Sequence, residues 1–201
     1  MGDHCSAMNG KSTVQKSERR RPPGRSQQDQ WIVADTREPG STVMKEYHFV
    51  TIWRTKAPLS EVYREIHASD SRPEWWPAVK KVETLSKGND QDLGTVRRMT
   101  WKGALPYSLA FDMKSTIVEP ETVLAGDAFG ELEGHGRWEF SREGEDTIIR
   151  YDWKVYTTKA WMNLFAPIAK PMFQWNHDHV MKGGAEGLSQ RLGAAVIDES
   201  P

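Results

Sequence analysis

The chain has a single cysteine, no long apolar run and no excess of charge of either sign. Cys5 stands alone, so no internal disulfide is expected. No apolar run approaches the roughly 18 residues that a membrane-spanning helix needs, and the N-terminus lacks the charged-then-apolar pattern of a secretory signal. Together these absences favour a cytoplasmic protein without a membrane span.

The near-absence of net charge argues against a nucleic-acid partner. The chain has 27 Lys and Arg residues against 28 Asp and Glu residues, so no strong positive field surrounds it. Four arginines lie close together near the N-terminus: Arg19, Arg20, Arg21 and Arg25. They leave a basic arm for RNA or anionic lipid as an alternative, but we interpret them as part of a solvated tail.

The chain divides into a tail, a domain and a second short tail. Residues 1–43 are rich in Ser, Gln, Arg, Gly and Pro, show neither helical nor strand periodicity, and are expected to be disordered. Residues 44–195 are expected to form one domain, followed by a C-terminal tail over residues 196–201. A domain of about 150 residues buries roughly 70% of its chain surface, so it can form a core without disulfides or metal ions.

Alternating apolar residues predict strands over much of the domain. Tyr47, Phe49 and Trp53 fall on one face of the first strand. Seven strands are expected, over residues 45–54, 79–86, 95–102, 107–117, 122–127, 132–140 and 148–157. Two short helices are expected between the first and second strands, one after Pro58 and one over residues 73–76.

One face of the predicted sheet is aromatic and the other is charged. The inward positions of the last two strands are apolar or glycine: Leu132, Gly134, Gly136, Trp138, Phe140, Ile149, Tyr151, Trp153 and Val155. The alternate positions are charged or histidine: Glu133, His135, Arg137, Glu139, Arg150, Asp152 and Lys154. The sheet is therefore expected to cover the core with one face and to meet water with the other.

A helix over residues 170–192 is expected to lie along the aromatic face. Every third or fourth residue falls on one stripe: Ala169, Met172, Phe173, Asn176, Val180, Gly183, Gly184, Gly187 and Leu188. A glycine weakens a helix by about 1 kcal/mol relative to alanine, so these glycines indicate close approach to bulky side chains. Pro167 and Pro171 predict either a start near Ile168 or a kink, after a separate helical turn over residues 159–166.

Several local sequences, in the same order, resemble one protein family. They are Ala57-Pro58, Trp75-Trp76-Pro77, Lys102-Gly103, Leu105-Pro106-Tyr107, Gly126-Asp127, Gly134-His135-Gly136 with Trp138, Tyr151-Asp152-Trp153, and Asn176-His177 with Met181 and Gly183. Residues 47–193 thereby resemble the polyketide cyclase/dehydrase branch of the SRPBCC superfamily, which includes START and birch-pollen-allergen-like proteins. The resemblance implies an α+β helix-grip fold, in which a curved antiparallel sheet wraps around a long C-terminal helix, with a cavity for an apolar or aromatic small molecule. It implies no reaction, because one fold hosts many functions.

Glycines on both facing elements predict a cavity between the sheet and the helix. Gly134 and Gly136 remove side chains from the sheet, and the helix glycines remove them from the other side. The residues expected to line the cavity are Trp53, Trp76, Tyr107, Phe111, Trp138, Tyr151, Trp153, Met172 and Asn176. An aromatic pocket with a few polar groups is typical of small-molecule sites. The alternative is a solid core, filled by some of the chain's nine tryptophans.

Three polar side chains are candidates for chemistry in the cavity. Tyr151 can donate a hydrogen bond or a proton, and Asn176 can orient a carbonyl or hydroxyl group of a ligand. Arg98 can hold a carboxylate or polarise an enolate if its strand turns it inward, although we favour surface exposure. For Tyr151 and Asn176 the alternative is structural pairing, because buried polar groups are generally satisfied within the protein.

No metal or cofactor site is expected. His177 and His179 are two residues apart, so they point in different directions on a helix, and no Cys or carboxylate joins them at ligand spacing. Gly134-His135-Gly136 lies inside a predicted strand and lacks the third glycine of a dinucleotide-binding turn. No serine has the flanking glycines of a nucleophile elbow.

Three functions follow from these observations, in decreasing order of support. The first is binding of a small hydrophobic molecule, such as a polyketide-like aromatic, a lipid or an isoprenoid. The second is a cyclase or dehydratase reaction in the same cavity, without a metal or nucleotide. The third is a protein-interaction scaffold that uses the charged outer face of the sheet.

Overall fold

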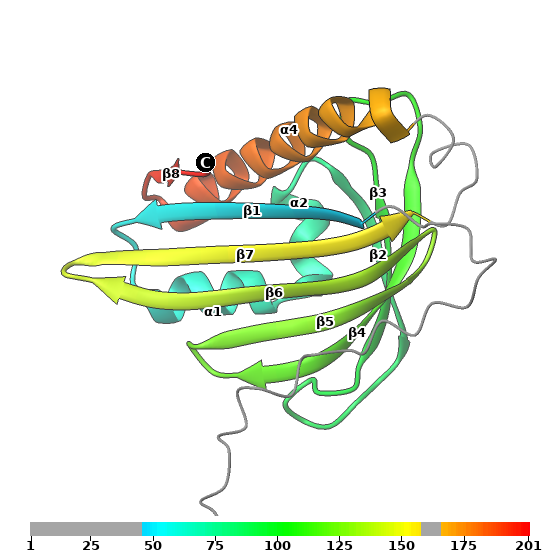
Figure 1. Ribbon diagram of the computed structural model, residues 1–201. Coiled ribbons are helices and arrows are strands. Elements are labelled where there is room, and N and C mark those ends of the chain that lie inside the picture. Colours follow the sequence, from blue (N-terminus) through cyan, green and yellow to red (C-terminus); the bar gives the residue numbers. More distant parts are fainter. Residues whose placement is uncertain (1–45, 158–165) are drawn as a thin grey trace, which may run out of the picture. The chain divides into compact units, whose positions relative to one another are not determined.

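The computed structural model describes residues 46–157 and 166–201. The tail expected over residues 1–43 lies outside the described residues, as does most of the helical turn expected over residues 159–166. The described residues form the α+β helix-grip arrangement that the sequence predicts, in which a curved sheet holds a long helix (Figure 1).

One antiparallel sheet of eight strands runs through the described residues, in the order β2-β3-β4-β5-β6-β7-β1-β8. The strands are β1 Glu46–Thr55, β2 Val79–Ser86, β3 Val96–Trp101, β4 Leu109–Glu119, β5 Val123–Gly130, β6 Leu132–Glu143, β7 Asp146–Thr157 and β8 Val196–Asp198. The seven strands predicted from alternation are confirmed. β5 and β6 both run further than expected, so that only Glu131 separates them.

Strand β8 contradicts the expectation of a C-terminal tail. Val196–Asp198 pairs antiparallel with Trp53–Thr55 of β1. Beyond it, Arg54 Nε donates to Glu199 Oε1 over 3.0 Å, and the Glu199 amide donates to the carbonyl oxygen of Ile52 over 2.8 Å. A strand of three residues is too short to show alternation, so the sequence pattern does not reveal it.

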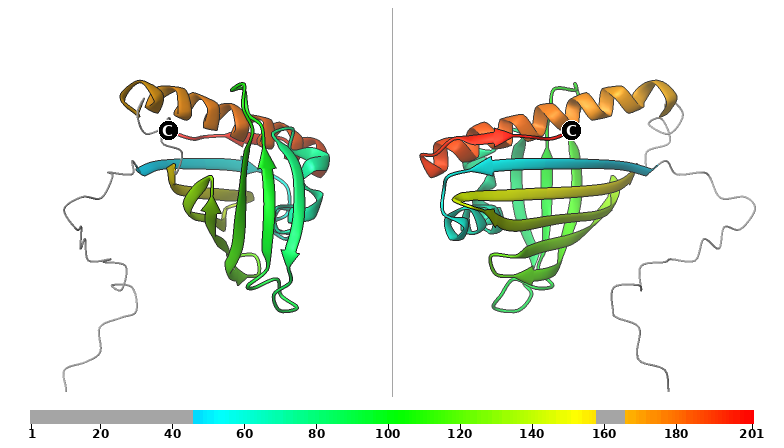
Figure 2. Two further views of the ribbon diagram at one scale, coloured as in Figure 1. Left: turned by 90° about the vertical axis from the view of Figure 1, so that its right-hand side faces the viewer. Right: turned by 60° about the vertical axis from the view of Figure 1, so that its left-hand side comes forward.

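Helices cover the concave face of the sheet. They are α1 Leu59–His67, the single turn η2 Ser69–Ser71, α2 Arg72–Trp75 and α4 Ala166–Leu192. α4 begins before the predicted start at Lys170 and continues through Pro171. Figure 2 shows α4 running along the sheet, with α1 and α2 close to its C-terminal half. No helix in the described part of the chain is long and apolar enough to cross a membrane.

Tryptophans build the core beneath the C-terminal half of α4. Trp53 of β1 is fully buried between Trp76, with ring centroids 5.9 Å apart, and Trp138, at 5.7 Å. A second buried cluster forms around Trp153, towards the start of β1. Tyr151 packs against both clusters, so it marks the place where they meet.

The glycines of α4 let two tryptophans approach the helix closely. A Cβ atom on Gly184 would lie 2.5 Å from the Trp76 ring, and one on Gly187 would collide with the Trp75 carbonyl oxygen. The close approach predicted from these glycines is therefore confirmed. The prediction that they open a cavity is wrong, because Trp75 and Trp76 fill the space that the missing side chains leave.

The outer face of the sheet is charged, as predicted, and neighbouring charges pair with one another. Arg98 Nε donates to Asp112 Oδ1 over 2.7 Å, and His135 Nδ1 lies 2.8 Å from Asp127 Oδ1. Exposed pairs of this kind contribute only about 0–1 kcal/mol each. The stability of the fold therefore depends on the buried face.

We predict opposite effects for alanine at two glycines of α4. Gly187→Ala places a Cβ atom against the backbone at Trp75, which cannot move without shifting α2, so this variant should be about 1–3 kcal/mol less stable than the wild type. Gly183→Ala meets nothing closer than Pro77 Cδ at 3.9 Å, so its better helix propensity should make it up to about 1 kcal/mol more stable. Urea unfolding followed by tryptophan fluorescence measures both; equal effects would contradict the packing described.

Candidate functional site

A cavity of about 220 Å³ lies between the concave face of the sheet and the middle of α4. Its wall is mostly apolar. From α4 it is lined by Phe173, Asn176, His177, Val180 and Met181. The predicted cavity is therefore confirmed, but it lies beside the packed glycines of α4 and not beneath them.

Stacked rings form the sheet wall of the cavity. Tyr151 lies between Trp138, whose ring centroid is 4.1 Å away, and Trp153, at 6.0 Å, with interplanar angles of 20° and 18°. Phe111 of β4 continues the wall, 5.9 Å from Trp153. Gly136 makes room for these rings, because a Cβ atom there would lie 2.7 Å from the Tyr151 hydroxyl oxygen. The wall offers a flat apolar surface on which an aromatic ligand can stack.

A half-buried arginine whose Nε is fully buried, with no direct carboxylate partner among the described residues, lines the same cavity. Arg72 is the first residue of α2, and its Nη2 donates to the carbonyl oxygen of Ile66 over 2.8 Å. Its Nη1 lies 4.0 Å from Met99 Sδ, and its buried Nε makes no hydrogen bond within the described residues. Burial lowers the pKa of Arg72 to about 10, so the side chain keeps its charge at neutral pH. A desolvated guanidinium with uncommitted N–H groups is well suited to bind an anion.

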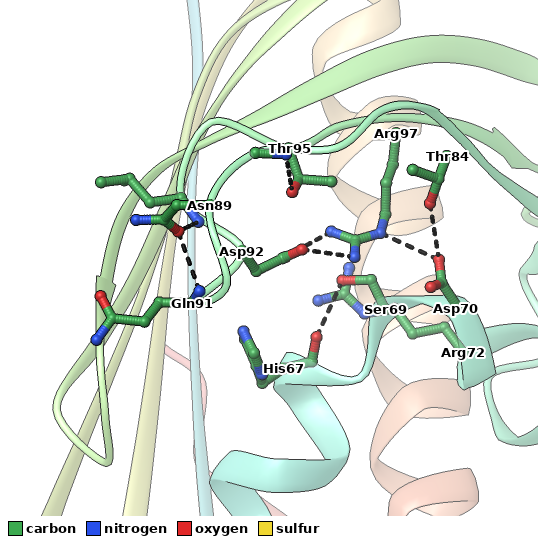
Figure 3. A network of polar contacts seen from close by, with 12 residues as sticks. His67, Ser69, Asp70, Arg72, Thr84, Asn89, Gln91, Asp92, Thr95 and Arg97 are labelled. Atoms are coloured by element: carbon green, nitrogen blue, oxygen red, sulfur yellow. Dashed lines mark hydrogen bonds and ion pairs between the residues drawn. The ribbon is translucent and has the colours of Figure 1, made fainter.

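The second arginine at this end of the cavity is neutralised by two carboxylates (Figure 3). Arg97 of β3 donates two hydrogen bonds to Asp92, of 2.6 and 2.8 Å, and a third to Asp70, of 3.0 Å. Asp92 lies in the β2–β3 loop with a left-handed backbone (φ 75°), which aspartate tolerates better than most residues. The network ties this loop to η2. Neither carboxylate forms a direct ion pair with Arg72, although the charges of both raise its pKa in part.

Two further titratable groups belong to this end of the cavity. Burial raises the pKa of Tyr151, although the charge of Arg72 lowers it in part, so the phenol is protonated at neutral pH. Burial lowers the pKa of His67, whose Nε2 has no hydrogen-bond partner in the described part of the chain. The imidazole is therefore neutral at pH 7. Arg72, Tyr151 and His67 can all donate hydrogen bonds to oxygens of a ligand.

A second group of polar atoms lines the cavity near the start of β1. Tyr47 is only 3% exposed, and its hydroxyl group makes no hydrogen bond to any described residue. His177 of α4 stacks on Phe49, with ring centroids 4.4 Å apart, and neither of its ring nitrogens has a hydrogen-bond partner within residues 46–157 and 166–201. Burial raises the pKa of Tyr47 and lowers that of His177, so both side chains are neutral at pH 7.

Asn176 has a structural partner. Its Oδ1 accepts a hydrogen bond of 3.3 Å from the Leu105 backbone amide, which fixes the β3–β4 loop over the cavity. Gly103 allows this contact, because a Cβ atom there would collide with Asn176 Oδ1. Structural pairing, the alternative stated for Asn176, therefore holds for its side-chain oxygen.

The structure gathers most of the predicted lining residues around the cavity. They are Trp76, Tyr107, Phe111, Trp138, Tyr151, Trp153 and Asn176. Three predictions need correction. Trp53 is enclosed by other tryptophans, and Met172 lies on the outer side of α4, where it is 37% exposed. Arg98 points to the outer face of the sheet with its side chain 51% exposed, so it cannot act in the cavity.

Sequence reasoning missed several polar residues of the cavity, among them Tyr47, His67, Arg72 and His177. Alternation places Tyr47 on the inward face, which is the signal that could have identified it. The signal for Arg72 is weaker. A positive charge at the first position of a helix interacts unfavourably with the helix dipole, so an arginine there indicates a role other than helix stabilisation. His67 and His177 show no local signal, since their burial depends on which elements pack over them.

Solved structures share this fold at low sequence identity. The Zhui aromatase/cyclase from Streptomyces sp. R1128 matches with a TM-score of 0.60 and 15% identity, over 74% of this chain and 94% of that chain. A START superfamily protein from Mycobacterium smegmatis matches with a TM-score of 0.60 and 15% identity, over 73% of this chain and 97% of that chain. No protein-family model and no curated protein sequence matches the chain. The likeness concerns the fold alone: this chain has the helix-grip fold that these structures share.

Proposed function

We propose that the protein binds a small, mainly aromatic molecule in the cavity, and that Arg72 holds an anionic or carbonyl oxygen of this ligand. The observation that carries the proposal is a wall of stacked rings beside a buried guanidinium that has no carboxylate partner in the described part of the chain. The cytoplasmic location expected from the sequence is part of the proposal.

The ring wall supports binding of a compact, flat ligand. Burial of apolar surface contributes roughly 25 cal/mol per Å², and stacking on Tyr151 or Trp153 adds to this contribution. The cavity volume of about 220 Å³ is below the roughly 300–1,000 Å³ that is usual for ligand sites. A small ring system therefore suits the cavity better than a long lipid or isoprenoid chain.

Arg72 supports a ligand that carries oxygen. Burial of a charge without a partner costs several kcal/mol. A ligand oxygen that accepts hydrogen bonds from the guanidinium offsets this cost. Nη2 already donates to the Ile66 carbonyl oxygen, and Nη1 lies beside Met99 Sδ, so no carboxylate competes with a ligand oxygen for a direct contact among the described residues.

A cyclase or dehydratase reaction is the second candidate function, and the position of Tyr151 favours it. The phenol is buried, protonated at neutral pH and close enough to Arg72 for the two groups to interact electrostatically. A protonated phenol can donate a proton while the guanidinium stabilises the negative charge on an enolate oxygen. One protein of this fold is named an aromatase/cyclase, so the reaction to test is cyclisation of a linear β-polyketone, in which an enolate carbon attacks a ketone carbon of the same chain and the resulting hydroxyl group leaves as water.

We predict that Arg72 distinguishes acidic from neutral aromatic ligands. Arg72→Met should weaken the binding of 2-naphthoate by about 10- to 100-fold, because a hydrogen bond to a charged group contributes roughly 1.5–3 kcal/mol. Binding of 2-methylnaphthalene should not weaken, because this neutral ligand takes no hydrogen bond from the guanidinium. Titration calorimetry, or quenching of tryptophan fluorescence, measures both affinities.

Arg98→Met is the matched control, because Arg98 is an exposed arginine paired with Asp112 on the outer face of the sheet. It should leave both affinities unchanged. Arg72→Met removes a desolvated charge but also the hydrogen bond to the Ile66 carbonyl oxygen, and these two effects oppose each other, so its denaturation midpoint should stay close to that of the wild type. Equal losses in the two variants, or no saturable binding of either ligand by the wild type, would refute the proposal.

The catalytic candidate makes a separate prediction for Tyr151. Tyr151→Phe keeps the ring stack and removes the proton donor, so turnover of a linear β-polyketone thioester should fall by about 100-fold or more, as expected for loss of a general acid. Affinity for 2-naphthoate should not weaken by more than about threefold, the size of one weak neutral hydrogen bond. Mass spectrometry of the cyclised product measures turnover. Unchanged turnover in the variant, or none in the wild type, excludes this candidate and leaves the binding proposal intact.

A further inference from the structure

A ligand held only at Arg72 leaves the second polar group of the cavity unexplained. Tyr47 and His177 both line the cavity. Together they bury one hydroxyl group and two ring nitrogens that make no hydrogen bonds within the described residues. A buried polar group without a partner costs about 1–3 kcal/mol. His177 Nδ1 has Asp178 Oδ1 nearby, so the Tyr47 hydroxyl group and His177 Nε2 are the atoms for which a bound molecule would supply partners.

Neighbouring side chains hold both residues in position. The Phe49 ring stacks on His177 at 4.4 Å and on Tyr47 at 6.2 Å, with interplanar angles of 11° and 9°. Phe173 packs edge-on against Tyr47 at 5.2 Å. Asp178 Oδ1 lies 3.6 Å from His177 Nδ1, which is too far for a hydrogen bond. The polar atoms are therefore preorganised for a ligand and do not need to reorient when it binds.

One ligand group cannot serve both polar ends of the cavity. Tyr151, which interacts electrostatically with Arg72, pairs with Thr51 of β1. Tyr47 lies earlier on the same inward face of β1. The four residue steps from Tyr47 to Thr51 span about 13 Å at roughly 3.3 Å per step. The ring wall lies between the two ends, so a ligand that reaches both has an aromatic body with polar groups at opposite sides.

We propose that Tyr47 and His177 form a second binding subsite, which takes a hydroxyl group at the end of the ligand remote from Arg72. The inference rests on the proposed function and defines the ligand class more closely, as an aromatic acid or ketone with a phenolic hydroxyl group at its far end. A hydroxyl group fits because it can accept a hydrogen bond from Tyr47 and donate one to the unprotonated nitrogen of His177. A carbonyl group can only accept, so it would leave that nitrogen without a partner.

A set of hydroxynaphthoates tests this subsite. 2-Naphthoate and its derivatives with one hydroxyl group on the ring remote from the carboxylate share the contact with Arg72. They differ in what they offer to Tyr47 and His177. At least one isomer should bind the wild type about 5- to 10-fold more tightly than 2-naphthoate, as expected for a buried hydrogen bond. Tyr47→Phe and His177→Phe should each reduce this gain to less than about twofold without weakening the binding of 2-naphthoate itself.

His179→Phe is the matched control, because His179 lies on the exposed side of α4 and should not influence the gain. Tyr47→Phe removes a buried hydroxyl group that has no described partner, so its denaturation midpoint should equal or exceed that of the wild type. This measurement shows that any lost gain does not come from unfolding.

Two results overturn the subsite. Either no isomer binds more tightly than 2-naphthoate, as expected if ordered water satisfies these atoms, or the gain survives both substitutions. In both cases binding of 2-naphthoate through Arg72 still supports the proposed function. If the wild type binds neither 2-naphthoate nor any isomer, the proposed function fails, and the subsite fails with it.

Discussion

The contact of Trp75 and Trp76, at the end of α2, with the glycines of α4 determines where the cavity can lie. Trp76 packs on Gly184, stacks with Trp75 at 5.3 Å and donates its Nε1 hydrogen to the Val180 carbonyl oxygen over 2.8 Å. This contact draws the C-terminal half of α4 against the core and fills the space there. Towards its N-terminus the helix carries larger side chains such as His177, which line the cavity instead of filling it. The C-terminal half of α4 therefore packs tightly against the core, whereas the part before it lines the cavity.

The positive charge of Arg72 lines the cavity because the nearby carboxylates form their ion pairs with Arg97. Asp70 and Asp92 both bind Arg97, and Arg72 receives a backbone carbonyl in place of a carboxylate within the described residues. A carboxylate beside Arg72 would stabilise the protein without ligand, but it would also compete with a ligand oxygen for the same N–H groups. Leaving that position to a ligand makes the protein less stable alone and more stable when the ligand is bound, because binding to the native state adds to its stability.

The arrangement of elements was predictable from local patterns, whereas the polar part of the site was not. Alternation from Tyr47 to Trp53 is strong because one face of β1 is buried, and β6 repeats this signal over much of its length. Alternation does not show which inward side chain lines the cavity: Trp53 and Trp76 both point inward, but only Trp76 reaches it. Arg72 escaped prediction for the same reason, because its surroundings depend on how the end of α1 and Met99 of β3 pack against it. The periodicity of the sequence shows which face of a strand or helix points inward. Packing between the elements decides which side chains reach the cavity.

The mixture of stacked rings and polar ends gives a physical reason for selectivity. A purely apolar molecule of suitable size would stack on Tyr151 and Trp153, but it would exclude water from Arg72 and His177 without replacing the lost hydrogen bonds. A strongly polar molecule would satisfy these groups and gain little from the ring wall. A site built to hydrogen-bond a substrate group rejects an analogue that lacks it far more strongly than an apolar pocket rejects a change of one methylene. The cavity should therefore discriminate ligands by the positions of their oxygens on an aromatic body, and only weakly by small differences in their hydrocarbon outline.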